Sequence, residues 1–134
     1  MRYAAREDST VCPLVRPMTK SSADLPFEID VRSVQQLLAA GDESVLLIDC
    51  REPAEHATAH IKGATLIPMK TIPQRLAELE PYRDGRIVVH CHHGGRSARV
   101  TNWLRQQGFA SAQNMTGGID AWSLEVDPAV PQYK

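Results

Sequence analysis

The sequence has few cysteines and little net charge, and each scarcity excludes a class of protein. Three cysteines in 134 residues are too few for the disulfide framework of a small secreted domain, and none has the paired spacing of a zinc site. Fifteen Lys and Arg residues against sixteen Asp and Glu residues leave a net charge of -1, without the basic excess of a nucleic-acid surface. We therefore expect neither a disulfide scaffold nor a nucleic-acid partner.

Long apolar segments are missing as well. No run approaches the roughly 20 apolar residues that a membrane-spanning helix needs, and residues 1–22 contain charges but no apolar core of a secretory signal. Together with the few cysteines, these features predict a cytoplasmic protein without a membrane partner.

What is present fits one globular domain. A hydrophobic content of 43% and a charged content of 23% are ordinary values. A chain of this length buries roughly two thirds of the surface that it exposes when unfolded. Residues 1–24 are polar, contain Pro13 and Pro17 and show no period, which predicts a flexible N-terminal arm before a folded domain at 25–134.

Within that domain, apolar runs alternate with segments of helical spacing. Short apolar runs predict five strands, at 27–29, 45–49, 64–67, 86–90 and 111–115. Helical spacing and helix-starting residues predict helices at 31–40, 52–59, 72–79, 96–107 and from 118 onwards. This alternation indicates an α/β domain around a largely parallel sheet.

The segment 90–97, with the sequence His-Cys-His-His-Gly-Gly-Arg-Ser, lies between a buried strand and a helix. In open α/β sheets, ligands bind beyond the carboxyl ends of the strands, and Cys91 is the first residue beyond this one. Gly94 and Gly95 accept the positive φ values that let backbone N–H groups curl around its sulfur. The start of the next helix and the Arg96 guanidinium add positive charge. These features favour the thiolate, which is the nucleophilic form of cysteine.

The residues of this segment also have interpretations other than a reactive Cys91. A lone cysteine after an apolar strand is usually a small buried hydrophobe, but the glycines, the arginine and the helix start together favour chemistry. His92 and His93 either tune substrate binding or are solvated on the loop. A zinc site made of Cys91, His92 and His93 is not predicted, because adjacent residues rarely converge on one metal and no fourth ligand is near in sequence.

Four separated motifs together resemble those of the rhodanese (sulfurtransferase) family. They lie at 47–56, 60–68, 90–97 and 117–122, in the order that the family has. The resemblance runs from about residue 27 to about residue 133, most of the chain outside the arm. It implies a central five-stranded parallel sheet with helices on both faces, and transfer of sulfane sulfur through a cysteine persulfide, with no metal and no organic cofactor.

The resemblance also implies roles for individual residues. Cys91 is the catalytic nucleophile, and Asp49 and Ser97 support its loop. The residues expected to bind substrate are His92, His93, Gly94, Gly95, Arg96 and Arg51. The loop from Cys91 to Arg96 has the length found in sulfur-transferring members. Related phosphatases and arsenate reductases have a longer loop, so a phosphatase-like or arsenate-reductase-like enzyme is the less favoured alternative.

The expected partners are a sulfur donor, either thiosulfate or a persulfide, and a cyanide or thiol acceptor. An alternative is a sulfur-carrier module that acts with partner proteins in sulfur-carrier activation. The presence of Cys91, Gly94 and Arg96 counts against a third possibility, a catalytically silent regulatory module.

Several neighbouring residues have two interpretations each. Arg96 contacts substrate or braces the loop through a carboxylate such as Asp49. Cys50 resolves the persulfide as a disulfide or is an inert buried thiol. Glu55, His56 and His60 are expected to pack and cap the helix that contains Pro53 instead of forming a catalytic set.

Overall fold

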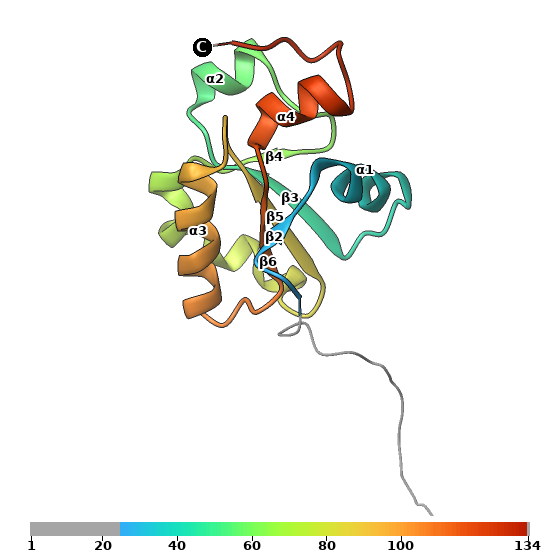
Figure 1. Ribbon diagram of the computed structural model, residues 1–134. Helices are drawn as coiled ribbons and strands as arrows, with labels where there is room; N and C mark the ends of the chain where they lie inside the picture. The colour runs from blue at the N-terminus through green and yellow to red at the C-terminus, as the bar shows by residue number, and fades with distance from the viewer. Residues whose placement is uncertain (1–24, 134) are drawn as a thin grey trace, which may run out of the picture.

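The computed structural model describes residues 25–133, so the predicted arm at 1–24 lies outside the described residues. Five strands form one sheet in the order β2-β6-β5-β3-β4, and every adjacent pair is parallel (Figure 1). The strands are β2 (Glu28–Ile29), β3 (Val45–Asp49), β4 (Thr65–Leu66), β5 (Arg86–His90) and β6 (Ala112–Met115). The predicted five-stranded parallel sheet is confirmed.

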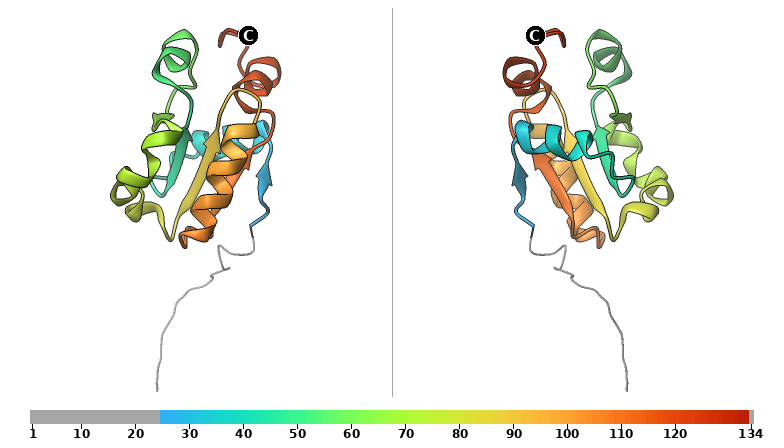
Figure 2. Two further views of the ribbon diagram at one scale, coloured as in Figure 1. Left: turned by 90° about the vertical axis from the view of Figure 1, so that its left-hand side faces the viewer. Right: turned by 90° about the vertical axis from the view of Figure 1, so that its right-hand side faces the viewer.

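The central strands are apolar on both sides because helices cover both faces of the sheet. The helices are α1 (Val31–Ala39), α2 (Pro53–Thr58), α3 (Gly95–Gln106) and α4 (Gly118–Glu125). The side chains of β3 alternate between two cores, so that Leu46 and Ile48 pack with residues of α3, and Leu47 packs with residues of α1 and α4. Figures 1 and 2 show α3 on one side of the sheet and α1 and α4 on the other.

One predicted helix has a different form. The α-helix expected at 72–79 is a run of 3-10 turns, η2 (Met69–Glu78), followed by η3 (Glu80–Tyr82). Pro73 and Pro81 cannot donate the backbone hydrogen bonds of an α-helix, and Arg75 breaks the run with φ -114° and ψ 17°. The tighter i to i+3 bonds remain, for example from the Leu79 N–H to the Leu76 carbonyl at 2.9 Å.

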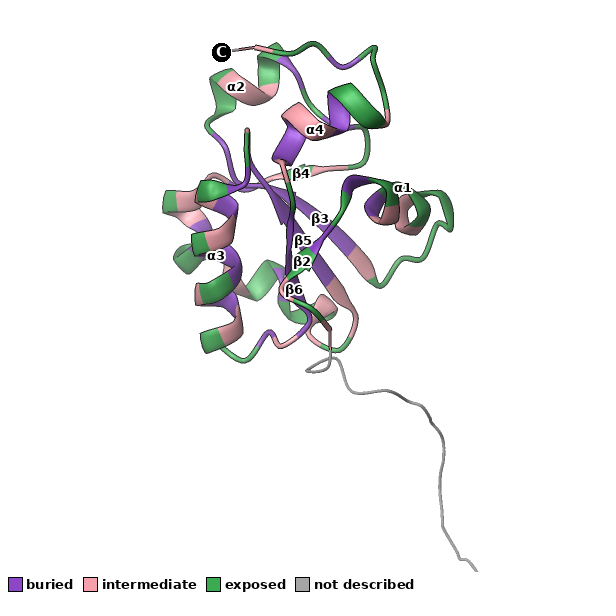
Figure 3. Cartoon of the chain, in the orientation of Figure 1, coloured by how far each residue is buried: buried purple, intermediate pink, exposed green. Residues whose placement is uncertain are grey.

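Burial is greatest along the middle of the sheet, where β3, β5 and β6 are almost completely covered (Figure 3). All strands are parallel, so their carboxyl ends lie at one edge, and α2, the start of α4 and the C-terminal segment gather beyond this edge (Figures 1 and 2). Within residues 25–133, no helix is both long enough and apolar enough to cross a membrane.

Candidate active site

Cys91 lies at the carboxyl end of β5, the central strand of the sheet, and the residue is only 1% exposed. Its Sγ accepts hydrogen bonds from the backbone N–H of Gly94 at 3.1 Å and from that of Ser97 at 3.4 Å. The Ser97 hydroxyl is a further 3.4 Å neighbour of the sulfur. The loop therefore surrounds the sulfur with hydrogen-bond donors, as the sequence predicts for a thiolate cradle.

These donors set the ionisation of Cys91. Burial acts to raise the pKa of the thiol, but the hydrogen bonds from Ser97 and Gly94 outweigh it and lower the pKa below its ordinary value. For Cys50, which follows the neighbouring strand β3, burial dominates and raises the pKa to about 12. Cys50 is therefore a neutral thiol at physiological pH. This favours an inert buried thiol over a cysteine that resolves the persulfide.

The two loop glycines differ in their conformations. Gly94 has φ 111° and is the N-cap of α3, and this left-handed conformation turns its N–H toward the sulfur. Gly95 is the first residue of α3 and is not among the glycines with positive φ, so the expectation that both glycines adopt positive φ is wrong for Gly95. One left-handed residue is enough because α3 itself completes the turn.

The start of α4 holds the loop from the other side. The N–H groups of Ile119 and Asp120 donate to the carbonyls of Cys91 at 2.9 Å and His92 at 3.1 Å. Gly118 has φ 61°, and a side chain on it would collide with the same two carbonyls. The glycine pair that opens α4 therefore lets this helix approach the loop closely enough to bind it.

Arg51 and Asp49 form a fully buried ion pair at the end of β3. The Arg51 Nε and Nη2 donate to the two carboxylate oxygens of Asp49 at 2.8 and 2.7 Å, and Nη2 also donates to the Ala59 carbonyl. Burial acts to raise the pKa of Asp49, but the hydrogen bonds from Arg51 and His56 and the interaction with His90 together outweigh it and lower the pKa to about 2. The geometry thus gives Arg51 a supporting place beside Asp49, whereas a substrate contact was expected of it.

Arg96 is engaged with a carboxylate on another helix. Its Nη1 and Nη2 donate to the two carboxylate oxygens of Glu55 at 2.7 and 2.9 Å, which joins α3 to α2. This pair, led by the hydrogen bond from Arg96, lowers the pKa of Glu55 to about 2. Asp49, suggested from the sequence as the carboxylate that braces Arg96, is instead paired with Arg51.

Glu55 and His56 do more than the packing and capping expected of them. Glu55 does accept a capping hydrogen bond from the Glu52 N–H at 3.1 Å, but it also binds Arg96. The His56 Nδ1 lies 2.8 Å from Asp49, and His60 stacks on His56. The helix α2 therefore contributes two side chains to the polar network under the loop.

Sequence reasoning missed Tyr133. Its hydroxyl accepts a hydrogen bond from Arg51 at 2.8 Å and donates one to Glu55 at 2.8 Å. Its ring stacks on His92, with 4.1 Å between the ring centroids. A tyrosine in a proline-containing C-terminal segment has no local pattern that indicates such contacts, so only the fold reveals them.

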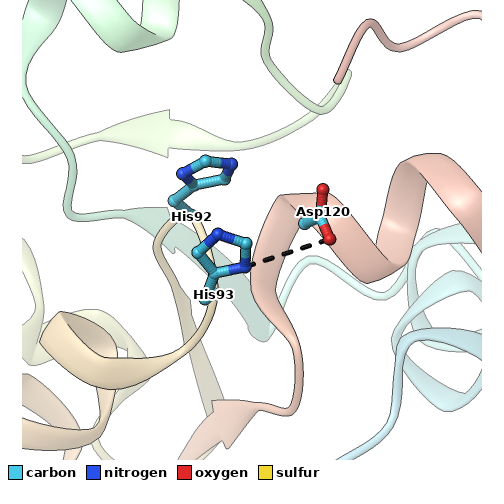
Figure 4. A group of neighbouring side chains, drawn as sticks. All are labelled: His92, His93 and Asp120. Carbon is cyan, nitrogen blue, oxygen red and sulfur yellow. Dashed lines mark ion pairs between the residues drawn. The ribbon is translucent and has the colours of Figure 1, made fainter. Parts of the chain in front are cut away.

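His92 and His93 lie side by side on the loop, with 3.9 Å between their ring centroids (Figure 4). His92 is enclosed between His93 and Tyr133, and its Nε2 is buried without a hydrogen-bond partner among the described residues. The side chain of His93 is 69% exposed. Asp120 lies opposite both rings and belongs to α4. Because α4 is distant from the loop in sequence, no local pattern links Asp120 to the two histidines.

The chain is similar to proteins of one family. The rhodanese-like domain family matches residues 30–125. A sulfurtransferase from Allochromatium vinosum is 43% identical over 103 residues, which are 77% of this chain and 94% of that protein. A rhodanese-like/PpiC domain-containing chloroplast protein from Arabidopsis thaliana is 45% identical over 91 residues, which are 65% of this chain but only 30% of that protein.

Solved structures show the same fold. A rhodanese-like domain protein from Staphylococcus aureus has a TM-score of 0.66 and 29% identity, over 81% of this chain and 100% of that one. A human single-domain sulfurtransferase has a TM-score of 0.65 and 25% identity, over 75% of this chain and 98% of that one. The fold described above is therefore shared with domains of similar size.

Proposed function

The chain belongs to the rhodanese family, and from this premise we propose that it is a sulfurtransferase in which Cys91 carries the sulfur as a persulfide. Relatives named as sulfurtransferases, from Allochromatium vinosum and Bacillus subtilis, support sulfur transfer as the general reaction. The observation that carries the finer proposal is the cradle in which the Gly94 and Ser97 N–H groups donate to the Cys91 sulfur.

In the first step, the Cys91 thiolate attacks the outer sulfur of thiosulfate. A bond forms between the two sulfurs, and the S–S bond of thiosulfate breaks, with its electron pair leaving on sulfite. The product is a persulfide anion on Cys91, one sulfur atom longer than the thiolate. Negative charge thus moves outward by one atom, and the N–H donors of the loop and the positive end of α3 stabilise it there.

In the second step, an acceptor attacks the outer sulfur of the persulfide. Cyanide would take this sulfur as thiocyanate, and the electron pair of the broken S–S bond returns to the Cys91 thiolate. No proton is consumed when both reactants are anions. The pKa of Cys91 therefore governs only the fraction of the enzyme in which Cys91 is the reactive thiolate. The lowered pKa raises that fraction near neutral pH.

The surrounding charges fix the cradle in this proposal. The buried Asp49–Arg51 pair holds the end of β3 beside the loop, and Arg96 keeps a positive charge at the start of α3. We assign contacts with the donor to His92, His93 and Gly95, which belong to the same loop. A thiolate nucleophile must stay unoxidised, and the sequence has too few cysteines for a disulfide framework, so we propose a cytoplasmic location.

The acceptor can also be a protein. An open hollow, lined by His92, His93, Asp120, Gln132 and Tyr133, lies beside the loop and offers a surface for the chain end of a partner. A putative sulfur carrier protein from Bacillus subtilis is 30% identical over 105 residues. These two observations favour a carrier role as the second candidate, in which the same Cys91 persulfide is passed to a partner.

Steady-state transfer from thiosulfate to cyanide tests the proposal. We expect thiocyanate release with the parallel-line kinetics of a double displacement, no release from Cys91→Ser, and unchanged release from the matched variant Cys50→Ser. Turnover that survives in Cys91→Ser would exclude the covalent route. A wild-type protein that takes up sulfur but does not pass it to cyanide would favour the carrier role.

A further inference from the structure

Three side chains beside the loop form a group that takes no part in the covalent steps of sulfur transfer: His92, His93 and Asp120, here called the His–Asp cluster (Figure 4). We propose that the His–Asp cluster binds a divalent transition-metal ion of the Zn2+ type, which links the Cys91 loop to α4. A zinc site is not predicted from the sequence, because the candidate ligands are adjacent residues. In the folded chain, α4 brings the Asp120 carboxylate next to His92 and His93.

The ligand atoms are close enough for one ion to draw them together. One ligand atom from each of the three residues lies within 4.8 Å of the others, and the His93 Nδ1 is 3.9 Å from the Asp120 Oδ2. Bonds of about 2.0–2.1 Å to zinc need ligand atoms closer together than this. The exposed side chain of His93 can rotate to close the gap, because 69% of its surface is free.

The other two ligands are already oriented. The Gln132 amide donates to the Asp120 Oδ1 at 2.9 Å, which leaves Oδ2 directed at the histidines. The Tyr133 ring holds the His92 ring in place by stacking. Metal-binding residues are commonly fixed by such outer contacts. The buried Nε2 of His92 has no hydrogen-bond partner among the described residues, and a bound metal ion would give it a partner.

The donor set indicates the kind of ion. Two imidazole nitrogens and one carboxylate oxygen suit Zn2+, Co2+, Ni2+ or Cu2+, whereas Ca2+ and Mg2+ prefer oxygen ligands alone. The cluster opens into the hollow beside the loop, which leaves room for water in the remaining coordination positions. Because an ion bound here joins the loop to α4, it should also stabilise the folded chain.

Isothermal titration of the full chain with Zn2+, in the absence of sulfur donors, tests this site. We expect one ion per chain and a higher melting temperature that a chelator reverses. Asp120→Asn and His93→Ala should each weaken binding by at least about tenfold, as losing one of three ligands should. His60→Ala, an exposed histidine outside the cluster, should bind as the wild type does.

Two thiol variants decide whether the site is the one proposed. Binding should persist in Cys91→Ser, and it should persist in Cys12→Ser, a position outside the described residues. Loss of binding in either variant, equal binding by Asp120→Asn and wild type, or no binding at all would each overturn the proposal. None of these outcomes depends on whether the protein transfers sulfur.

Discussion

The hydroxyl of Ser97 has one proton and three acceptors within reach. Which acceptor receives its hydrogen bond affects the ionisation of Cys91. The acceptors are the Asn114 Oδ1, the Gly94 carbonyl at 3.2 Å and the Cys91 Sγ at 3.4 Å. The Asn114 amide is oriented by its own donation to the carboxylate of Glu28, at 3.0 and 3.2 Å. When Cys91 ionises, its sulfur becomes a stronger acceptor, and the hydroxyl can turn toward it.

Replacing Ser97 with alanine should therefore raise the pKa of Cys91. One hydrogen bond to a charged group corresponds to roughly one pKa unit. The pKa is measured from the ultraviolet absorbance of the thiolate, as the difference between each protein and its Cys91→Ser counterpart. Thr101→Val is the matched control, because this buried hydroxyl bonds the Ser97 carbonyl and not the sulfur. Equal shifts in the two variants would show that the Ser97 hydroxyl has no special effect.

At this scale, the sequence predicts the cradle and proposes Asp49 and Ser97 as its supports, but it does not predict the distant side chains that hold the site together. The order of Cys91, Gly94 and Ser97 is local, so strand, turn and helix patterns were sufficient to place them. The contacts of Arg51 with Tyr133, and of Ser97 with Asn114, join residues far apart in the chain. No spacing in one sequence encodes such contacts, and they follow only from the three-dimensional fold.

Among the secondary-structure elements, α2 and α3 are joined by the Glu55–Arg96 pair beside the loop. The side chain of Arg96 is 32% exposed and that of Glu55 is 22% exposed, so solvent screens the pair. A pair of this kind stabilises a protein by about 1 kcal/mol at most. Its larger consequence is electrostatic. The carboxylate of Glu55 offsets the positive charge of Arg96, which is the cation of the loop that contains Cys91, where an anionic donor would react.

Glu55→Gln should lower the KM for thiosulfate roughly fivefold at low salt, because about 1 kcal/mol of charge repulsion is removed. Glutamine keeps the side-chain oxygen that caps α2, so the fold should persist. Glu43→Gln makes the same change in charge before β3, at the opposite edge of the sheet, and should leave KM unchanged. The difference should disappear at high ionic strength. A KM that is unchanged or higher in Glu55→Gln would contradict this account.

The helix predicted at 72–79 shows that hydrophobic spacing alone does not distinguish an α-helix from 3-10 turns. Ile72, Leu76 and Leu79 are spaced four and three residues apart, which fits an α-helix, but the last interval fits a 3-10 turn equally well. The prolines at 73 and 81 decide between the two forms, because each removes a backbone donor. The strands next to the site have no such conflict, and their predicted bounds agree closely with the structure.

For the whole molecule, buried titratable groups determine stability in acid. His90 ends β5 in full burial, and burial lowers its pKa to about 4 from an ordinary value of 6.5. The unfolded chain binds this proton below pH 6.5, whereas the folded chain binds it only near pH 4. Stability therefore falls as the pH drops through this window. Asp49, with its pKa lowered to about 2 from 3.8, adds a second loss at lower pH, between those two values.

His90→Leu should remove the first of these losses. In the wild type, the free energy of unfolding should fall by up to about 1.4 kcal/mol per pH unit between pH 6.5 and 4 from this residue alone. Urea unfolding at several pH values measures the slope. The leucine variant should show a smaller slope, and His60→Leu, at an exposed position, should keep the wild-type slope. Equal slopes in His90→Leu and wild type would mean that His90 does not control acid stability.

The central claim is that Cys91 carries the transferred sulfur, and intact-protein mass after incubation with thiosulfate tests it most directly. We predict that the wild type and Cys50→Ser each gain one sulfur atom, which reductant or cyanide removes, and that Cys91→Ser gains none. A gain of the same sulfur on Cys91→Ser, or no gain on a wild type whose Cys91 is shown to be reduced, would contradict the account.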